Sequence, residues 1–303
     1  MYDQATMLYL YVETPLHAGS GAGLGVVDLP IQRERVTGYP LVQSSGIKGK
    51  LRAEASDSQQ GKNDSSAWKD KIAAVFGPDV KASEHAGALA PCDARLLLFP
   101  VRSLLGIFAW TTSRDALARF VRDANAAGQS FSWAIEAPPD ESTAFVADNS
   151  DLVDADRLVL EEFAFKAVVK PFVKQVANDL VENALPDSPE YQYWRDKLPR
   201  SLVVLPENAF RDFTQFSTEV VSRIRLDPKK KTVQQGALWT EEHLPADTLL
   251  YAPIYASRPR KSGALTPDDA SGVLQFVKDL GLERVQLGGD ETVGRGLVRL
   301  RWA

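Results

Sequence analysis

The residues best suited to chemistry lie between Thr14 and Arg52. Glycines alternate along the first part of this segment, one carboxylate, Asp28, follows them, and cationic side chains come next. The glycines are Gly19, Gly21, Gly23 and Gly25, and the cations are Arg33, Arg35, Lys48, Lys50 and Arg52. Glycine lets main-chain N–H groups approach a ligand closely, and clustered cations attract phosphates. The segment therefore predicts a site that grips an anionic polymer and places one carboxylate for its cleavage.

Asp28 and His17 are the two side chains of this segment that could act on a reacting group. Asp28 could bind a divalent metal or orient the attacking group when an RNA strand is cut; its alternative role is to accept hydrogen bonds in a turn. His17 could donate to a phosphate or act as a general base, although a lone histidine is more often a packing or hydrogen-bonding residue. The residues alone leave both alternatives open.

Three cations, Lys48, Lys50 and Arg52, begin a predicted helix after Gly46. The N–H groups and the dipole of a helix N-terminus favour an anion, and the cations add to that attraction. We therefore expect phosphate contacts at this point, the alternative being a solvated helix face. A second glycine-rich loop, 287–296, carries Arg295 and lies near the other end of the sequence.

Other chemistries fit the sequence poorly. Pro30 follows the first glycine loop too closely for a dinucleotide-binding helix, and Gly46 to Lys50 lacks the G-K-[ST] ending of a nucleotide-binding loop. The three histidines lack zinc-ligand spacing, and there is no G-x-S-x-G motif. Several remaining polar and aromatic residues are expected to have structural rather than catalytic roles. We expect Cys92, Trp110, Trp133 and Trp194 in the core, and Glu161, Glu162, Glu241 and Glu242 in solvent.

Composition narrows the class of protein. The 303 residues are 44% hydrophobic and 25% charged, which supports a globular core. No stretch reaches the roughly 18–20 apolar residues of a membrane helix, the first residues do not form a signal peptide, and there is one cysteine. These features predict a cytoplasmic protein with no membrane partner. The net charge of −5 argues against a generic nucleic-acid binder. The cations are clustered, however, and a local basic groove on an acidic protein can still bind phosphates.

The elements that must position these residues alternate between strands and helices. The apolar run 7–12 predicts a strand buried on both faces, and Ile47, Leu51 and Ala55 form the stripe of a helix. Further apolar runs and stripes predict more elements, and a polar loop separates the first two helices. We expect helices over 68–76, 117–124 and 209–220, strands over 95–102, 106–111, 131–135, 249–256 and 297–302, a loop over 57–66, and a helix starting at 266.

Residues 220–242 predict a long hairpin. Val220, Ser222, Ile224 and Leu226 share one face of the first strand, and the turn contains three consecutive lysines. We assign the hairpin, with its flanks, to 217–248 and the whole sequence, 1–303, to one domain. The interleaved elements, with strands first and last, predict an α+β fold: a modified ferredoxin-like core with large insertions, the hairpin among them.

Several longer motifs together resemble one family. They are HAGSGAGLGVVDLPIQRERVTGYP, SGIKGKLR, GALAPCDARLLLFPVRSLLGIFAW, GALWTEEHLP and LGGDETVGRGLVRL. They look like the backbone subunit of the Cmr complex, the type III-B CRISPR effector, whose backbone belongs to the RAMP superfamily. The likeness covers most of the sequence and is weakest over about 135–200.

The resemblance implies a fold, partners and site residues. Such subunits have an RRM-like core, stack head to tail along a CRISPR RNA beside other Cmr subunits, and use a hairpin thumb to interrupt the duplex of guide and complementary target RNA. Asp28 and His17 match the positions linked to target cleavage. The RNA-binding candidates are Gln32, Arg33, Arg35, Lys48, Lys50, Arg52, Trp239, Gly288, Gly289 and Arg295.

The resemblance also implies a reaction, in which the target's own 2′-hydroxyl attacks the phosphate and Asp28 binds a divalent metal, Mg²⁺ or Mn²⁺. One position departs from the family's pattern: Val36 stands where a histidine is expected, which predicts slower cleavage or none. A non-cleaving structural RNA-binding subunit is therefore one alternative. A stand-alone endonuclease that processes CRISPR RNA is a second, and an unrelated phosphate-binding enzyme is a third.

Overall fold

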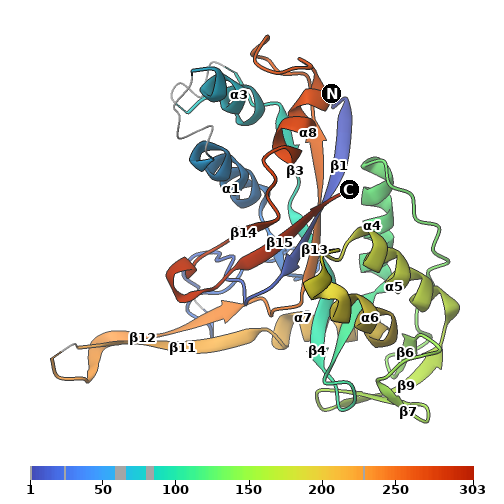
Figure 1. The fold of residues 1–303 in the computed structure, drawn as a ribbon. Helices are drawn as coiled ribbons and strands as arrows, with labels where there is room; N and C mark the ends of the chain where they lie inside the picture. The colour runs from blue at the N-terminus through green and yellow to red at the C-terminus, as the bar shows by residue number, and fades with distance from the viewer. Residues whose placement is uncertain (1, 24, 59–65, 80–84, 228) are drawn as a thin grey trace.

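A large mixed sheet forms the centre of the molecule (Figure 1). The computed structural model describes residues 2–23, 25–58, 66–79, 85–227 and 229–303. The strand order is β14-β15-β1-β13-β4-β5-β10-β6-β9-β8-β7, with β2 and β3 as side branches on β4 and β13. The strands of the first half are β1 Gln4–Val12, β2 Leu41–Val42, β3 Leu89–Pro91, β4 Ala94–Arg102, β13 Leu249–Ala256, β14 Arg284–Gln286 and β15 Leu297–Trp302.

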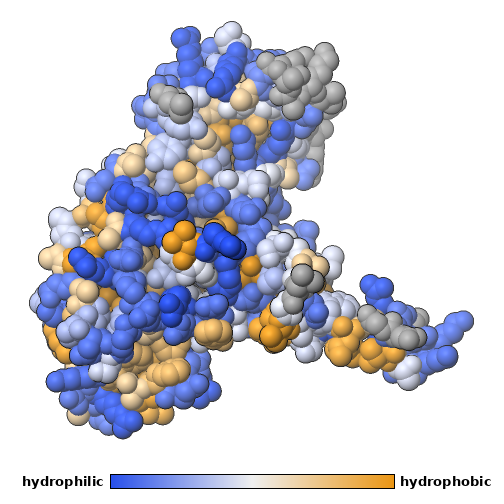
Figure 2. Space-filling model, turned by 180° about the vertical axis from the view of Figure 1, so that it is seen from behind, coloured by the Kyte–Doolittle hydropathy of each residue, from blue (hydrophilic) through white to orange (hydrophobic). Residues whose placement is uncertain are grey.

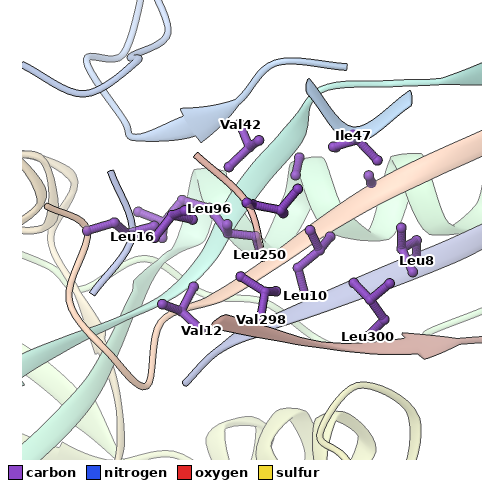
Figure 3. Close-up of a cluster of buried hydrophobic side chains, with 14 of the residues drawn as sticks. Leu8, Leu10, Val12, Leu16, Val42, Ile47, Leu96, Leu250, Val298 and Leu300 are labelled. Carbon is purple, nitrogen blue, oxygen red and sulfur yellow. The ribbon is translucent and has the colours of Figure 1, made fainter. Parts of the chain in front are cut away.

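β1 is buried on both faces because helices cover the sheet from two sides. Leu8, Leu10 and Val12 belong to one hydrophobic cluster, and Figure 3 shows them packed with side chains of other strands and of α1. The alternate residues, Met7 and Tyr9, enter a second cluster on the opposite face. This accounts for a strand that is apolar at every position: each face has a hydrophobic layer of its own.

Two helices begin at a residue whose side chain caps them. Ser113 accepts a hydrogen bond from the N–H of Ala116 and so caps α4, and Asp269 caps α8 in the same way. Helices α1, α3 and α8 lie on one side of β1 and β13, and α4, α5 and α6 lie on the other (Figure 1). The bounds are α1 Ser44–Asp57, α3 Ser66–Phe76, α4 Arg114–Ala126, α5 Pro171–Asn183, α6 Gln192–Ser201, α7 Glu207–Phe216 and α8 Ala270–Lys278, with short 3₁₀ turns at Pro189–Tyr191 and Glu291–Val293.

The second half of the sheet begins at β5. β5 pairs with β4 on one side and, in parallel, with β10 on the other. The remaining strands extend the sheet away from β1. They are β5 Phe108–Ser113, β6 Thr143–Val146, β7 Val153–Asp154, β8 Arg157–Leu160, β9 Phe163–Val169 and β10 Leu202–Leu205.

A two-stranded hairpin projects from this body (Figure 1). β11 Glu219–Leu226 and β12 Val233–His243 pair antiparallel and lie within the residues assigned to the hairpin from the sequence. The face that carries Val220, Ser222, Ile224 and Leu226 is exposed. Its apolar side chains therefore face solvent, so they do not contribute to the core of this chain.

Most predicted elements are present, and a few predictions are wrong. Residues 131–135 form no strand, and α7 ends at Phe216, so Val220 lies in β11 rather than on a helix. The last helix starts at Ala270 rather than at 266, because Asp269 supplies the cap. Trp110 and Trp133 are buried as expected, while Trp194 and Cys92 are only partly covered. Most of the predicted 57–66 loop, residues 59–65, lies outside the described residues.

Within the described part of the chain, no helix is long and apolar enough to cross a membrane.

Candidate functional site

The outer edge of β12 is the place where the candidate catalytic residues meet. Leu29 pairs with Glu241 in a parallel bridge, and Leu16 pairs with Leu244 in an antiparallel one. The residues next to these two bridges are Asp28 and His17. Asp28 binds Thr240 and His17 binds Glu242. Since these two residues of β12 are about 7 Å apart along the strand, the edge holds both candidate side chains in one small region at the root of the hairpin.

Asp28 is an exposed carboxylate with a fixed orientation. Its Oδ2 accepts from Thr240 N at 2.7 Å and from Thr240 Oγ1 at 2.9 Å. These hydrogen bonds favour the charged form and hold the pKa of Asp28 below its usual range. Both of these bonds go to Oδ2, and no described residue donates a hydrogen bond to Oδ1. One oxygen atom therefore orients the group, and the other is accessible to solvent.

His17 is oriented by the backbone of β12. Its Nδ1 lies 2.7 Å from Glu242 O, and because a carbonyl can only accept, Nδ1 carries the proton and donates. Nε2 of a neutral ring is then an acceptor, and it lies beside Gly19 in the first glycine loop. The structure thus presents His17 in the tautomer that a general base requires.

The second glycine loop packs directly on His17. Gly289 N donates to His17 O at 2.9 Å. Gly288 has a φ of 77°, and a Cβ there would lie 2.2 Å from His17 O. Only glycine fits this position without moving one of the two backbones. The two glycine loops, far apart in sequence, therefore form one site.

Glu242 and Arg33 form a largely buried ion pair beneath this edge. Arg33 Nη2 lies 2.5 Å from Glu242 Oε1, and the Glu242 side chain is 7% exposed. Glu242 also accepts from Ile31 N at 3.0 Å and Thr218 Oγ1 at 2.8 Å. The prediction that Glu241 and Glu242 are solvated is wrong, because partners from distant segments bury both. Glu242 ties the first glycine loop to the hairpin.

A second polar cluster lies on the neighbouring face of the root. Glu241, His243 and Asp290 have potential metal-ligand atoms within 4.8 Å of one another. Arg223 occupies this cluster, with Nε 2.7 Å from Glu241 Oε2 and Nη2 3.0 Å from Asp290 Oδ2. The ring of His243 lies 5.5 Å from that of His17. Burial lowers the pKa of His243, so the ring is neutral at neutral pH.

The candidate RNA contacts fall into two groups. Lys48 is half-buried at the start of α1, in a pocket of about 480 Å³ that Ser44, Ser45 and Arg260 also line. Its Nζ donates to Leu89 O at 2.9 Å, and burial lowers the pKa of Lys48. Arg35 is exposed and pairs with no acid among the described residues. These two cations can still meet a ligand.

The other candidates already have partners within the chain. Gln32 donates to Gly19 O and accepts from Gln43 N, and Arg33 is paired with Glu242. Lys50 pairs with Glu54, Arg52 with Asp79, Arg295 with Glu219, and Trp239 Nε1 donates to Glu241. Most of these are surface ion pairs of low strength, which a phosphate can replace.

A divalent metal fits Asp28 better than it fits the second cluster. Mg²⁺ keeps several waters and needs only one or two carboxylate oxygens besides substrate phosphates, and Asp28 Oδ1 is accessible. In the second cluster Arg223 already lies between the two carboxylates, so a cation would have to displace it. Asp28 can therefore hold such an ion, together with an RNA phosphate.

Sequence reasoning missed the residues that orient the site. Thr240, Glu241, Glu242 and His243 are consecutive and lie within the motif GALWTEEHLP, yet their partners are up to 225 positions away. The alternation of β12 could have assigned Glu241 and His243 to one face and Thr240 to the other. No feature of the sequence identifies Arg223 and Asp290 as their partners.

Comparisons with known proteins identify the family of this chain. The RAMP superfamily model matches residues 9–299. "CRISPR system Cmr endoribonuclease Cmr4" of Pyrococcus furiosus is 36% identical over 98% of this chain and 95% of its own length. "CRISPR system CMR subunit Cmr4" of Saccharolobus solfataricus is 26% identical over 99% and 97%. The crystal structure of oligomeric Cmr4 from P. furiosus has a TM-score of 0.72 and 29% identity, covering 99% and 97%.

The matched family model defines the class of protein as the RAMP superfamily, and the chain shares its α+β fold with the Cmr4 crystal structure over almost its whole length. The chain belongs to the RAMP superfamily and, within it, to the Cmr4 family of CRISPR proteins.

Proposed function

We propose that this chain is the backbone subunit of a type III-B RNA-guided effector complex and that it cleaves complementary target RNA. The observation that carries the proposal is the joint placement of His17 and Asp28 on one edge of β12. The Pyrococcus furiosus relative is a Cmr endoribonuclease, which supports the same activity. In this proposal guide pairing selects the target, and the protein supplies shape, phosphate contacts and cleavage.

The proposal assigns a role to the core, as an RRM-like domain, and to the hairpin, as the thumb. The order β15-β1-β13-β4, with α1 after β1 and α8 after β13, follows the β-α-β-β-α-β sequence of a ferredoxin-like, RRM-like domain. The hairpin β11–β12 serves as the thumb that interrupts the duplex of guide and target. The thumb root then holds the cleavage site next to the interrupted position, which explains why His17 and Asp28 are fixed to β12.

The guide RNA follows two kinds of cation. Some form surface ion pairs that a phosphate can replace, and others pair with no acid among the described residues. Lys48 lies at a helix N-terminus, where N–H groups and the dipole also favour a phosphate, and Arg35 and Arg295 extend the path. Copies of the chain stack head to tail along the guide, with other Cmr subunits at the ends. The oligomeric crystal structure of the relative supports this stacking.

The reaction is attack by the target's 2′-oxygen on the neighbouring phosphorus. The new bond joins the 2′-oxygen to phosphorus, and the bond from phosphorus to the 5′-oxygen breaks. The departing 5′-oxygen takes a proton from water, which leaves a 2′,3′-cyclic phosphate and a 5′-hydroxyl. His17 Nε2 accepts the proton of the 2′-hydroxyl, because Nδ1 is already protonated and donates to Glu242. Mg²⁺ or Mn²⁺, bound through Asp28, would supply positive charge for the developing anionic oxygens.

The test is a cleavage gel with the assembled complex, a guide and labelled complementary RNA. We expect metal-dependent, evenly spaced cuts that EDTA, Asp28→Asn or a 2′-deoxy sugar at the cut site abolishes, with target binding retained. Asp140→Asn is the matched control, because Asp140 is also an exposed carboxylate held by a hydroxyl and an N–H. That variant should cut normally.

Two other results would assign another function. Tight target binding without cuts by the unmodified complex would identify a non-cleaving structural subunit. It would point to Val36, which is 96% exposed and stands where the resemblance predicts a histidine. Metal-independent cutting of a guide precursor by the chain alone would identify a stand-alone processing nuclease.

A further inference from the structure

Arg223 joins the root of the hairpin to the second glycine loop. Its Nε donates to Glu241 Oε2 at 2.7 Å, and its Nη2 donates to Asp290 Oδ2 at 3.0 Å. Glu241 lies in β12, and Asp290 lies in the loop that packs on His17. The Glu241 side chain is 7% exposed and that of Arg223 is 26% exposed, so water screens this pairing less than it screens a pair on the open surface. The reaction proposed above gives Arg223 no part.

Asp290 is adjacent to the backbone contact that holds His17. Gly289 N donates to His17 O at 2.9 Å, and Asp290 is the next residue, with a φ of 63°. Val293 N donates back to Asp290 O at 3.1 Å, so Asp290 forms the corner of a tight turn. A shift of the Asp290 carboxylate therefore moves the N–H group that meets His17.

The guanidinium of Arg223 suits a link of this kind because it is a rigid fork. Two of its nitrogens reach acids from two different segments at once, whereas the ammonium of lysine is a single point of charge. The other oxygen of Glu241 accepts from Trp239 Nε1 at 2.7 Å, and Trp239 is the cross-strand neighbour of Arg223. Glu241 is therefore fixed, and it orients the fork toward Asp290.

Two other contacts between the hairpin and this loop are longer. Arg295 Nη1 lies 3.6 Å from Glu219 Oε2, and the Glu219 side chain is 42% exposed. His243 Nε2 lies 3.4 Å from Asp290 Oδ2. Within the part of the chain that the structure describes, Arg223 thus makes the shortest ion pair between hairpin and loop.

The hairpin can act on the body through its root. Figure 2 shows the hairpin projecting from the body, and Figure 1 shows its root beside the loop between β14 and β15. A displacement of the strands therefore reaches this loop through contacts at the root, and the pair of Arg223 with Asp290 is one of them.

We propose that Arg223 is a positioning residue for His17 and couples the orientation of His17 to the position of the hairpin. With the hairpin seated, Arg223 holds Asp290 and so keeps the glycine loop against His17. With the hairpin displaced, the loop loosens and His17 is no longer held in place for the 2′-hydroxyl. The inference rests on the proposed function, because it takes His17 as the base and the hairpin as the element that interrupts the duplex.

A phosphate contact is the competing role for Arg223. Its Nε and its Nη2 already donate to carboxylates, one of which is almost completely buried. RNA would have to break both pairs and leave Glu241 with an uncompensated charge away from water, which is costly. The contacts therefore favour positioning over RNA binding.

The first experiment measures kcat and KM for target cutting by the assembled complex. Arg223→Lys and Arg223→Gln should each lower kcat by about tenfold at unchanged KM, because lysine keeps the charge but loses the fork. Asp290→Asn should do the same. Arg223→Gln combined with Asp290→Asn should cut no more slowly than either single variant, since both remove one contact.

The matched control is Arg225, two residues farther along β11. It is exposed and pairs with no acid among the described residues. Arg225→Lys and Arg225→Gln make the same changes in charge and shape, and both should keep the unmodified kcat. Thermal melting of all variants confirms that they are folded at the assay temperature.

A second readout does not depend on cleavage. The chain has three histidines, so NMR of the full chain labelled at histidine can follow the ring nitrogens of His17. Arg223→Lys should reduce the share of the tautomer protonated at Nδ1, because the ring is no longer held against Glu242 O. Arg225→Lys should leave this share unchanged.

Three results would overturn the proposal. They are a normal kcat in Arg223→Lys, an unchanged tautomer of His17 in that variant, and a raised KM at unchanged kcat, which would assign Arg223 to RNA binding. If the unmodified complex does not cut its target, the proposed function fails on that result. The NMR comparison of Arg223→Lys with Arg225→Lys then still decides whether Arg223 positions His17.

Discussion

Replacing Gly288 by alanine tests whether the two glycine loops hold the site together. The new Cβ would lie 2.2 Å from His17 O, which forces the loop backbones apart and breaks the hydrogen bond from Gly289 N. Positive φ adds about 1–2 kcal/mol for a residue other than glycine, and loss of a backbone hydrogen bond adds about 1 kcal/mol. Gly288→Ala should therefore lower the free energy of unfolding by roughly 2–4 kcal/mol, including displacement of the loop.

The same loop supplies a matched control. Gly294 also has a φ of 77°, but a Cβ there meets nothing within 4 Å. Gly294→Ala should therefore show only the conformational cost of about 1–2 kcal/mol. Urea unfolding gives the stability difference, and target cleavage under conditions where both variants are folded shows whether His17 has moved. If the two variants had equal stabilities and cleavage rates, the contact between the loops would not organise the site.

Three further predictions concern the residues around this contact. Glu242→Ala leaves Arg33 without its buried partner and should cost about 3–5 kcal/mol in urea unfolding, whereas the exposed control Glu283→Ala should cost under about 1 kcal/mol. Thr240→Val removes one donor to Asp28, so the pKa of Asp28 should rise toward its usual range. Because Asp28 acts when ionised, the acid limb of the pH–rate profile should move to higher pH; an unchanged limb would exclude Asp28 as the group that titrates there. Arg35→Ala should weaken guide binding and reduce its salt dependence by about one phosphate contact, without changing stability; an unchanged salt slope would remove Arg35 from the RNA path.

The sequence predicts elements well where local pattern decides the outcome. The continuous apolar run of β1 and the stripe of Ile47, Leu51 and Ala55 in α1 both match the structure, because periodicity and burial are directly related. The hairpin strands were also predictable, but the exposure of their apolar face was not. Alternation shows which residues share a face and leaves open which face is covered.

The site was predictable only in part for a different physical reason. His17 and Asp28 could be proposed from residue type and resemblance, but the side chains that orient them depend on long-range pairing. A glutamate such as Glu242 is expected in water unless a buried cation meets it. Here that cation, Arg33, is 209 positions away and its approach depends on the whole fold. Charged residues that become buried through such pairing are therefore the hardest for a single sequence to place.

The position of β1 between β13 and β15 has a consequence for synthesis of the chain. β1, Gln4–Val12, is hydrogen-bonded only to strands that begin roughly 240 residues or more later. At ribosomal rates of about 5–20 residues per second, this apolar strand waits some 10–50 s before its first neighbour emerges. During translation it presents two unpaired edges, which is a risk for aggregation. Nascent copies of this chain should therefore depend on chaperones until β13 and β15 have been synthesised.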